Sequence, residues 1–156
     1  MTERSVPASE MMGNDHRELD GVWERFRATP ESDFVTRREV FDSFRAGLLH
    51  HIAIEEDQLF PPMKGDEPSR HALVERLVEQ HSQIKELLGR IDLALATRSG
   101  TLDEACEELI NVLWAHNALE EGSAYPWLDG HLTEIEVQTL KRRLEEKPAP
   151  GSSSES

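Results

Sequence analysis

Residues 51–61 read HIAIEEDQLFP and residues 116–126 read HNALEEGSAYP, so the chain contains two copies of one eleven-residue motif. Both copies follow the same pattern: His, three residues, Glu-Glu, three residues, an aromatic residue and Pro. The His and the first Glu of each copy are four residues apart, which places them on one face of a helix. The phrase therefore predicts two helices, each with a His and a Glu on the same face.

Apolar residues around both phrases recur at spacings of three and four, the period of an amphipathic helix. The third helical segment carries a stripe of Leu73, Leu77, His81, Ile84, Leu88, Ile91 and Leu95. Three more stripes consist of His16, Leu19, Trp23 and Phe26; of Phe41, Phe44, Leu48, His51 and Glu55; and of Leu109, Leu113, His116 and Glu120. No segment alternates clearly enough with a period of two to predict a strand. We therefore expect an all-α fold, an up-down-up-down four-helix bundle.

Residues that cap or stop helices mark the expected boundaries. Prolines 61 and 62 are expected to stop the second helix, and Pro126 to stop or kink the fourth. Thr133 should open a short additional C-terminal helix that carries Ile135, Leu140 and Leu144. Thr36 could also lie inside a helix that starts nearer Ser32. The predicted caps are Ser69 after Pro68 and three capping boxes: Thr36 with Glu39, Thr101 with Glu104, and Thr133 with Glu136.

Composition separates a single folded domain from two tails. Residues 1–8 are expected to be an N-terminal tail, and residues 9–146 one domain of ordinary size. Residues 147–156 read KPAPGSSSES, which has too few apolar side chains to pack, so a disordered C-terminal tail is predicted.

Charge and hydropathy exclude several classes of partner. The chain of 156 residues has 31 acidic and 17 basic residues, and a net charge of −14 repels nucleic acid and anionic membranes. No stretch approaches the ~20 apolar residues of a membrane span, and the start MTERSVPASE lacks the apolar core of a signal peptide. Cys106 is the single cysteine, which excludes an internal disulfide and fits a reducing compartment. A cytoplasmic protein is therefore expected.

Polar residues stand on the inward stripes, where a bundle needs apolar ones. Burying an unpaired ionised Glu would cost several kcal/mol or shift its pKa until it is neutral. A single core His is usually just hydrogen bonded, and Glu-Glu on a helix is usually solvated. Together, however, these residues come from all four long helices, and we expect them to bind metal: His16, His51, Glu55, His81, His116 and Glu120.

The number of predicted ligands indicates two metal ions. Four imidazoles and two carboxylates exceed the four ligands that usually close a structural zinc site. In a two-metal site Glu55 and Glu120 could bridge ions roughly 3.5–4 Å apart, with positions left open for a small ligand. Mixed nitrogen and oxygen ligation favours iron or manganese, and open positions favour iron.

The order H…HxxxEE…H…HxxxEE, followed by LFP in the first copy and YP in the second, resembles the hemerythrin-like HHE cation-binding domain family. The resemblance covers roughly residues 10–130. It implies a four-helix bundle around a non-haem di-iron centre with a bridging oxo or hydroxo group. Oxygen-carrying members have HxxxH in the third helix, whereas this chain has only His81, with Leu77 and Lys85 at the flanking positions. One terminal nitrogen ligand is missing, which counts against reversible oxygen carriage.

Three functional classes follow from this resemblance. The first is an oxidoreductase, or a protein that handles dioxygen, hydrogen peroxide or nitric oxide; whether it turns over a substrate stays open. The second is an oxygen-binding or sensing module, although no output segment is visible in the sequence. The third is an iron storage or donation protein that repairs iron centres.

Residues beside the predicted ligands receive weaker assignments. Glu56 and Glu121 should point sideways, where each could hydrogen bond a ligand His. Tyr125 could donate a hydrogen bond toward the site or carry an electron, but packing at the helix end is favoured. His50 lies about 100° around the helix from His51 and is expected near the site or at the surface; the alternative is that it replaces the missing ligand.

The remaining residues of interest are expected to be structural. His71 and His131 should be solvated, and Trp23 and Trp114 should lie in the core. Cys106 should be a small buried apolar residue and not a reactive thiol.

Overall fold

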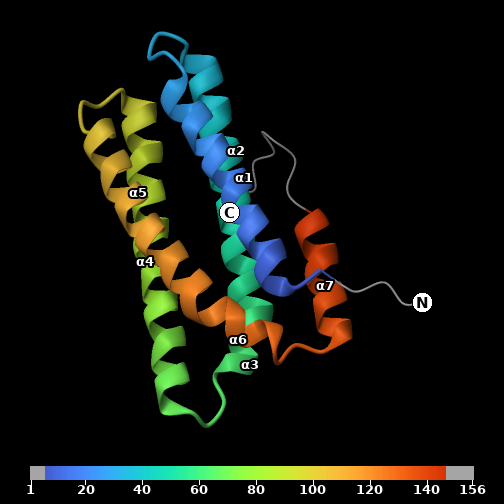
Figure 1. The fold of residues 1–156 in the computed structure, drawn as a ribbon. Helices are drawn as coiled ribbons and strands as arrows, with labels where there is room; N and C mark the ends of the chain where they lie inside the picture. Colours follow the sequence, from blue (N-terminus) through green and yellow to red (C-terminus); the bar gives the residue numbers. More distant parts are fainter. Residues whose placement is uncertain (1–5, 147–156) are drawn as a thin grey trace.

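The computed structural model describes residues 6–146, which are helical apart from connecting loops and contain no strand in that range (Figure 1). Consecutive long helices run antiparallel, with α1 packed on α2 and α4 packed on α5. The predicted up-down-up-down bundle is confirmed. Its long helices are α1 (Ala8–Ala28), α2 (Phe34–Ile54), α4 (Pro68–Thr97) and α5 (Leu102–Leu119). The predicted tail at residues 147–156 lies outside the described residues.

Each repeated phrase continues its long helix through a π turn. These turns span Glu55–Leu59 and Glu120–Ala124, and the short helices α3 (Phe60–Met63) and α6 (Tyr125–Asp129) follow them. The prolines explain the wider turn, because a proline ring in a regular α-helix clashes with the carbonyl four residues earlier. The prediction that prolines 61 and 62 stop the second helix is wrong, since helical backbone continues through both. Pro126 was predicted to stop or kink the fourth helix, and it directly follows the second π turn and Tyr125.

Acidic side chains take the capping position at two helix starts where Thr36 and Ser69 were predicted to cap. Asp33 caps α2 and accepts a hydrogen bond from the backbone N–H of Thr36, so Thr36 lies inside the helix, which is the alternative that the sequence left open. Glu67 precedes Pro68 at the start of α4 and accepts from the N–H of Ser69. Acidic side chains at these positions also interact favourably with the helix dipole.

The two other predicted capping boxes have opposite outcomes. The hydroxyl of Thr101 makes no capping bond to α5, and lies instead 2.9 Å from the hydroxyl of Ser99. Thr133 and Glu136 form the predicted reciprocal box at the start of α7 (Glu134–Glu145).

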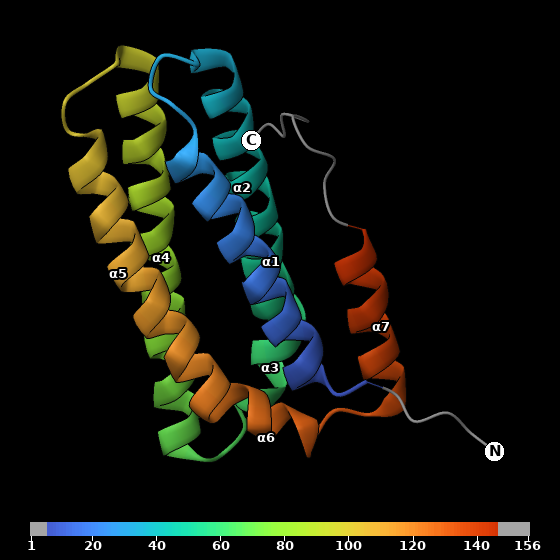
Figure 2. The same cartoon turned by 45° about the horizontal axis from the view of Figure 1, so that its top comes forward.

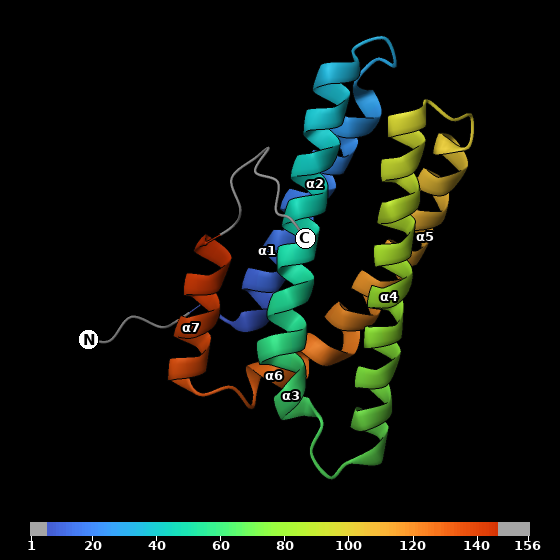
Figure 3. The ribbon, with the colours of Figure 1, turned by 180° about the vertical axis from the view of Figure 1, so that it is seen from behind.

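Helix α7 packs outside the bundle against α1 and α2, as the red helix shows in Figures 2 and 3. The helix contains Ile135, Leu140 and Leu144 as predicted; Leu140 is buried and Leu144 is partly buried, whereas Ile135 is 77% exposed. His50 of α2 donates a hydrogen bond of 2.7 Å from Nε2 to the carbonyl of Arg143. His50 therefore helps attach α7 to the bundle.

Buried apolar side chains form two clusters along the bundle axis. One lies between the four long helices and includes Phe26, Phe44, Ile91 and Leu109, together with Trp23 and Cys106 as predicted. The other lies near α3, α6 and α7 and includes Met12, Ile54, Leu77 and Leu140.

Trp114 was predicted in the core but is 60% exposed. Leu113 and His116 define the inward face of α5, and a residue next to Leu113 is rotated by about 100° toward solvent. Burial of Cys106 raises the pKa of its thiol to about 11, which fits an unreactive core residue. None of the described helices is long and apolar enough to cross a membrane.

Candidate metal centre

The structure brings all six predicted site residues together between the two apolar clusters. We call His16, His51, Glu55, His81, His116 and Glu120 the His/Glu cluster. None of these side chains is more than 4% exposed. The helical period explains why the four imidazoles lie inside the bundle, because each His replaces one apolar residue in the inward stripe of its helix.

The cluster consists of two groups of four residues that share both carboxylates. One group joins His16 and His51 to Glu55 and Glu120, and the other joins His81 and His116 to the same two Glu side chains. Within each group, one potential ligand atom from every residue lies within 4.8 Å of all the others. The arrangement offers two adjacent positions for cations.

Each carboxylate presents one oxygen to each pair of imidazoles. Glu55 Oε2 lies 3.2 Å from His51 Nε2, while Glu55 Oε1 lies 2.9 Å from His81 Nε2. Glu120 Oε1 lies 3.2 Å from His16 Nε2, while Glu120 Oε2 lies 3.0 Å from His116 Nε2. Both Glu side chains therefore have the orientation of carboxylates that bridge two cations.

Each cluster imidazole is held from its outer side by a hydrogen bond of 2.7 Å at Nδ1. Because the acceptors are oxygens, Nδ1 carries the proton and donates, which directs Nε2 inward. As predicted, Glu121 accepts from His16 and Glu56 accepts from His81. The remaining acceptors are Asp15 for His51 and Gln80 for His116.

Sequence reasoning missed Asp15 and Gln80. Each immediately precedes a cluster His on its own helix, but it orients the His of the neighbouring helix. The available signal was that Asp15 and Gln80 occupy equivalent positions, directly before His16 and His81.

The donor set fits a bound metal. With Nδ1 protonated and engaged, each inward Nε2 can offer its lone pair to a cation. Glu120 Oε2 is fully buried and accepts no hydrogen bond from the described residues, although it lies 3.0 Å from His116 Nε2. A buried carboxylate oxygen normally has a hydrogen-bond donor or a metal as its partner.

Tyr125 lies inside the site and not merely at the helix end, as had been favoured. Its hydroxyl donates toward Glu55 Oε2 at 2.5 Å and lies 2.9 Å from Glu120 Oε1. It is also 3.1 Å from His16 Nε2 and 3.3 Å from His51 Nε2. Burial, with the charges of Glu120 and Glu55, raises the pKa of Tyr125 well above its usual value.

The π turn places Tyr125 there. At about 100° per residue, a regular α-helix would direct Tyr125 about 140° away from Glu120. In the π turn the Tyr125 N–H instead bonds the Glu120 carbonyl five residues earlier, which brings both side chains to one face.

Without metal, protons neutralise the buried charges. Burial alone would lower the pKa of His51, but the charge of Glu55 and hydrogen bonds to Asp15 and Glu55 raise it to about 10. Burial likewise opposes protonation of His116, but the nearby carboxylates of Glu120 and Glu55 favour it and raise the pKa of His116 to about 9. The pKa of Glu55 lies well below its usual range, because the charge of His51 outweighs burial.

The other histidines lie away from the cluster. His71 is half exposed and faces Glu75 at 3.6 Å, and exposed His131 stacks on Trp127 with ring centroids 3.9 Å apart. His50 bonds Arg143, so it does not supply the missing fifth imidazole. Leu77 is fully buried in an apolar cluster.

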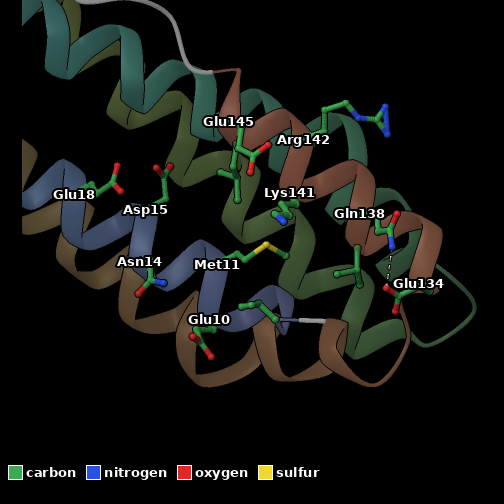
Figure 4. Close-up of a pocket in the computed structure, with 13 residues that line it drawn as sticks. Glu10, Met11, Asn14, Asp15, Glu18, Glu134, Gln138, Lys141, Arg142 and Glu145 are labelled. Carbon is green, nitrogen blue, oxygen red and sulfur yellow. Dashed lines mark hydrogen bonds between the residues drawn. The ribbon is translucent and has the colours of Figure 1, made fainter. Parts of the chain in front are cut away.

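A groove of about 940 Å³ lies between α1 and α7 (Figure 4). Its walls carry Glu10, Met11 and Asn14 from α1, and Gln138, Lys141 and Arg142 from α7. None of the six cluster residues lines this groove. Asp15 lines this groove and also accepts the hydrogen bond from His51, so a hydrogen-bond partner of the cluster lies in the groove wall.

A buried His/carboxylate cluster at the centre of a four-helix bundle is typical of a metal-binding protein. The family model described as the hemerythrin HHE cation binding domain matches residues 7–128, and the chain belongs to this family. The resemblance seen in the sequence is thereby confirmed.

Two known proteins with hemerythrin-like names are similar to the chain. It is 28% identical over 131 residues to an uncharacterized hemerythrin-like protein of Schizosaccharomyces pombe; the match covers 82% of this chain and 62% of that protein. The fold is similar to the crystal structure of a hemerythrin HHE cation binding domain-containing protein from Mycobacterium kansasii, with a TM-score of 0.73 and 21% identity. That similarity covers 90% of this chain and 86% of the other.

Proposed function

We propose that the His/Glu cluster holds two iron ions, one beside His16 and His51 and the other beside His81 and His116. The observation that supports this most directly is the orientation of Glu55 and Glu120, each with one oxygen toward each His pair. Four imidazole nitrogens with bridging carboxylate oxygens favour iron over sulfur-preferring metals. A bridging oxo or hydroxo group completes the proposed centre.

The proposed activity is redox chemistry on a small oxidant: dioxygen, hydrogen peroxide or nitric oxide. Bound iron would supply the exchange of electrons with that molecule. The chain would supply fixed imidazoles, which Asp15, Glu56, Gln80 and Glu121 orient at Nδ1. Apolar clusters on both sides would exclude water from the centre.

The absence of a fifth imidazole supports a reactive centre over a reversible carrier. Leu77 occupies one of the two positions that could have supplied it, and it packs among Ile54, Leu59 and other apolar side chains. An unfilled coordination position would admit the oxidant directly.

The test is anaerobic loading of the metal-free chain with ferrous iron, followed by metal analysis and visible spectra before and after addition of oxygen or peroxide. We expect about two irons per chain and catalytic loss of peroxide. Loading that never exceeds one iron would refute the two-metal centre. A stable oxygen-dependent absorption band without turnover would instead assign a binding or sensing role, and release of iron would assign donation.

A further inference from the structure

The site is built from two copies of one hairpin. A shift of 65 positions carries His16 to His81, His51 to His116 and Glu55 to Glu120. The same shift relates buried core pairs, such as Leu19 to Ile84 and Phe44 to Leu109. The hairpin of α1 and α2 thus corresponds to that of α4 and α5, and any difference at equivalent positions makes the two halves unequal.

The first difference is an oxygen atom. Tyr125 corresponds to Phe60, and each follows a π turn and reaches a cluster His of the other hairpin. The ring of Phe60 stacks on His81 with centroids 5.6 Å apart, whereas the ring of Tyr125 lies 5.5 Å from that of His16. Only the His16 and His51 half therefore receives a hydroxyl.

That hydroxyl has the spacing of a metal ligand. Around one ion with bonds of about 2.0–2.2 Å, adjacent ligand atoms lie roughly 3 Å apart. The Tyr125 oxygen lies 2.5–3.3 Å from four cluster atoms: His16 Nε2, His51 Nε2, Glu55 Oε2 and Glu120 Oε1. The His16 and His51 half therefore contains five side chains that can bind a metal, whereas the His81 and His116 half contains four.

The second difference is a charge. Asp15 corresponds to Gln80, so His51 donates to a carboxylate and His116 donates to a neutral amide. The remaining outer partners, Glu121 and Glu56, are both carboxylates. A carboxylate at Nδ1 makes an imidazole a stronger metal ligand, so this difference favours the same half as Tyr125 does.

We propose that the two metal positions are unequal: Tyr125 is a fifth protein ligand beside His16 and His51, and Asp15 strengthens that position further. This inference rests on the proposed two-iron centre. Ligation replaces the phenolic hydrogen by iron and releases it as a proton to solvent. The position beside His81 and His116, with one donor fewer, is the one that exchanges its metal and admits an external molecule.

The test follows iron release from the ferric, fully loaded chain in excess EDTA by metal analysis and visible absorption. We expect one iron to leave before the other, and a phenolate-to-iron charge-transfer band to disappear with the slower one. Tyr125→Phe should abolish the band and accelerate the slow phase about 10–100-fold. The matched control Phe60→Tyr should slow the fast phase, because it gives the other half a phenol.

A second pair of variants separates charge from the phenol. Asp15→Asn should accelerate the slow phase while keeping the band, and Gln80→Glu should slow the fast phase; circular dichroism checks helicity in all four variants. The inference is wrong if wild type loads two irons that leave together, or if it shows no phenolate band. It is also wrong if folded Tyr125→Phe keeps the slow phase unchanged. A wild type that binds one iron refutes the two-iron centre itself.

Discussion

Nδ1 of His51 donates a 2.7 Å hydrogen bond to Asp15, which directly precedes His16 in α1. Gln80, which directly precedes His81 in α4, accepts an equivalent bond from His116. Glu121 and Glu56 accept from Nδ1 of His16 and His81, and each of these two bonds joins one hairpin to the other. The four bonds therefore connect helices both within and between the hairpins at the level of the His/Glu cluster, and residues next to the predicted ligands fix their orientation.

Substitution of a predicted ligand should remove metal, while substitution of its neighbour should not. His51→Ala or Glu55→Ala is expected to cost at least one iron per chain, because Nε2 of His51 and both oxygens of Glu55 face the cluster. His50→Ala should retain iron and lose about 1 kcal/mol of stability, since its bond to Arg143 attaches α7. Metal analysis and thermal melting of the purified variants decide this; an empty His50→Ala with a full His51→Ala would contradict the assignment.

Glu120→Ala and Glu121→Ala should differ in the same way. Glu120→Ala removes both oxygens that face the imidazoles and should lose metal, whereas Glu121→Ala removes only the acceptor at His16 Nδ1. We expect Glu121→Ala to load iron with affinity reduced about 10–100-fold. Competition with a chelator of known affinity measures this, with Glu121→Gln as the control that keeps an acceptor oxygen. Equal metal loss in Glu120→Ala and Glu121→Ala would contradict the assignment of metal binding to Glu120 and of His16 orientation to Glu121.

Metal removal should loosen the bundle. Two carboxylates and four imidazoles stay buried without iron, and a ligand that binds only the folded state raises the melting temperature. We expect the metal-free chain to melt below the loaded chain in calorimetry. Coincident melting of the two forms would mean that metal does not bind at the cluster.

The metal-free chain should lose stability as the solution becomes alkaline. The folded-state pKa values of His51 and His116, about 10 and about 9, exceed the value of 6.5 for free histidine. Their stabilisation is therefore complete below pH 6.5 and disappears as pH rises through these values. The lowered pKa of Glu55 acts oppositely, since its contribution is present above 4.5 and is lost as pH falls.

Melting of the metal-free chain at about pH 6, 8 and 10 tests this dependence, and we expect the melting temperature to fall across the series. The iron-loaded chain is the control. Iron takes the place of the imidazole protons, so the loaded form should lose less stability over the same range. A melting temperature of the metal-free chain that rises toward pH 10 would contradict the assigned protonation.

The helical architecture and the six residues of the cluster could be predicted from the amino-acid sequence alone. Both follow from local geometry: a period near 3.6 puts residues three and four apart on one face, so His51 and Glu55 must point together wherever the helix packs. The capping box of Thr133 and Glu136 is equally local, and it formed as predicted. The core position predicted for Trp114 was wrong because it rested on the hydrophobicity of one residue, whereas the stripe through Leu113 and His116 directs the next position toward solvent.

The surroundings of the cluster, in contrast, depend on contacts between helices that are distant in the sequence. The pairing of Asp15 with His51 joins residues 36 positions apart on different helices, and no local period specifies such a contact. The place of Tyr125 depends on a π turn that alters the rotation of the chain after Glu120. The half of the duplicated site that receives a phenol and an additional carboxylate is therefore settled by packing between helices, because side chains from different helices meet only in the folded bundle.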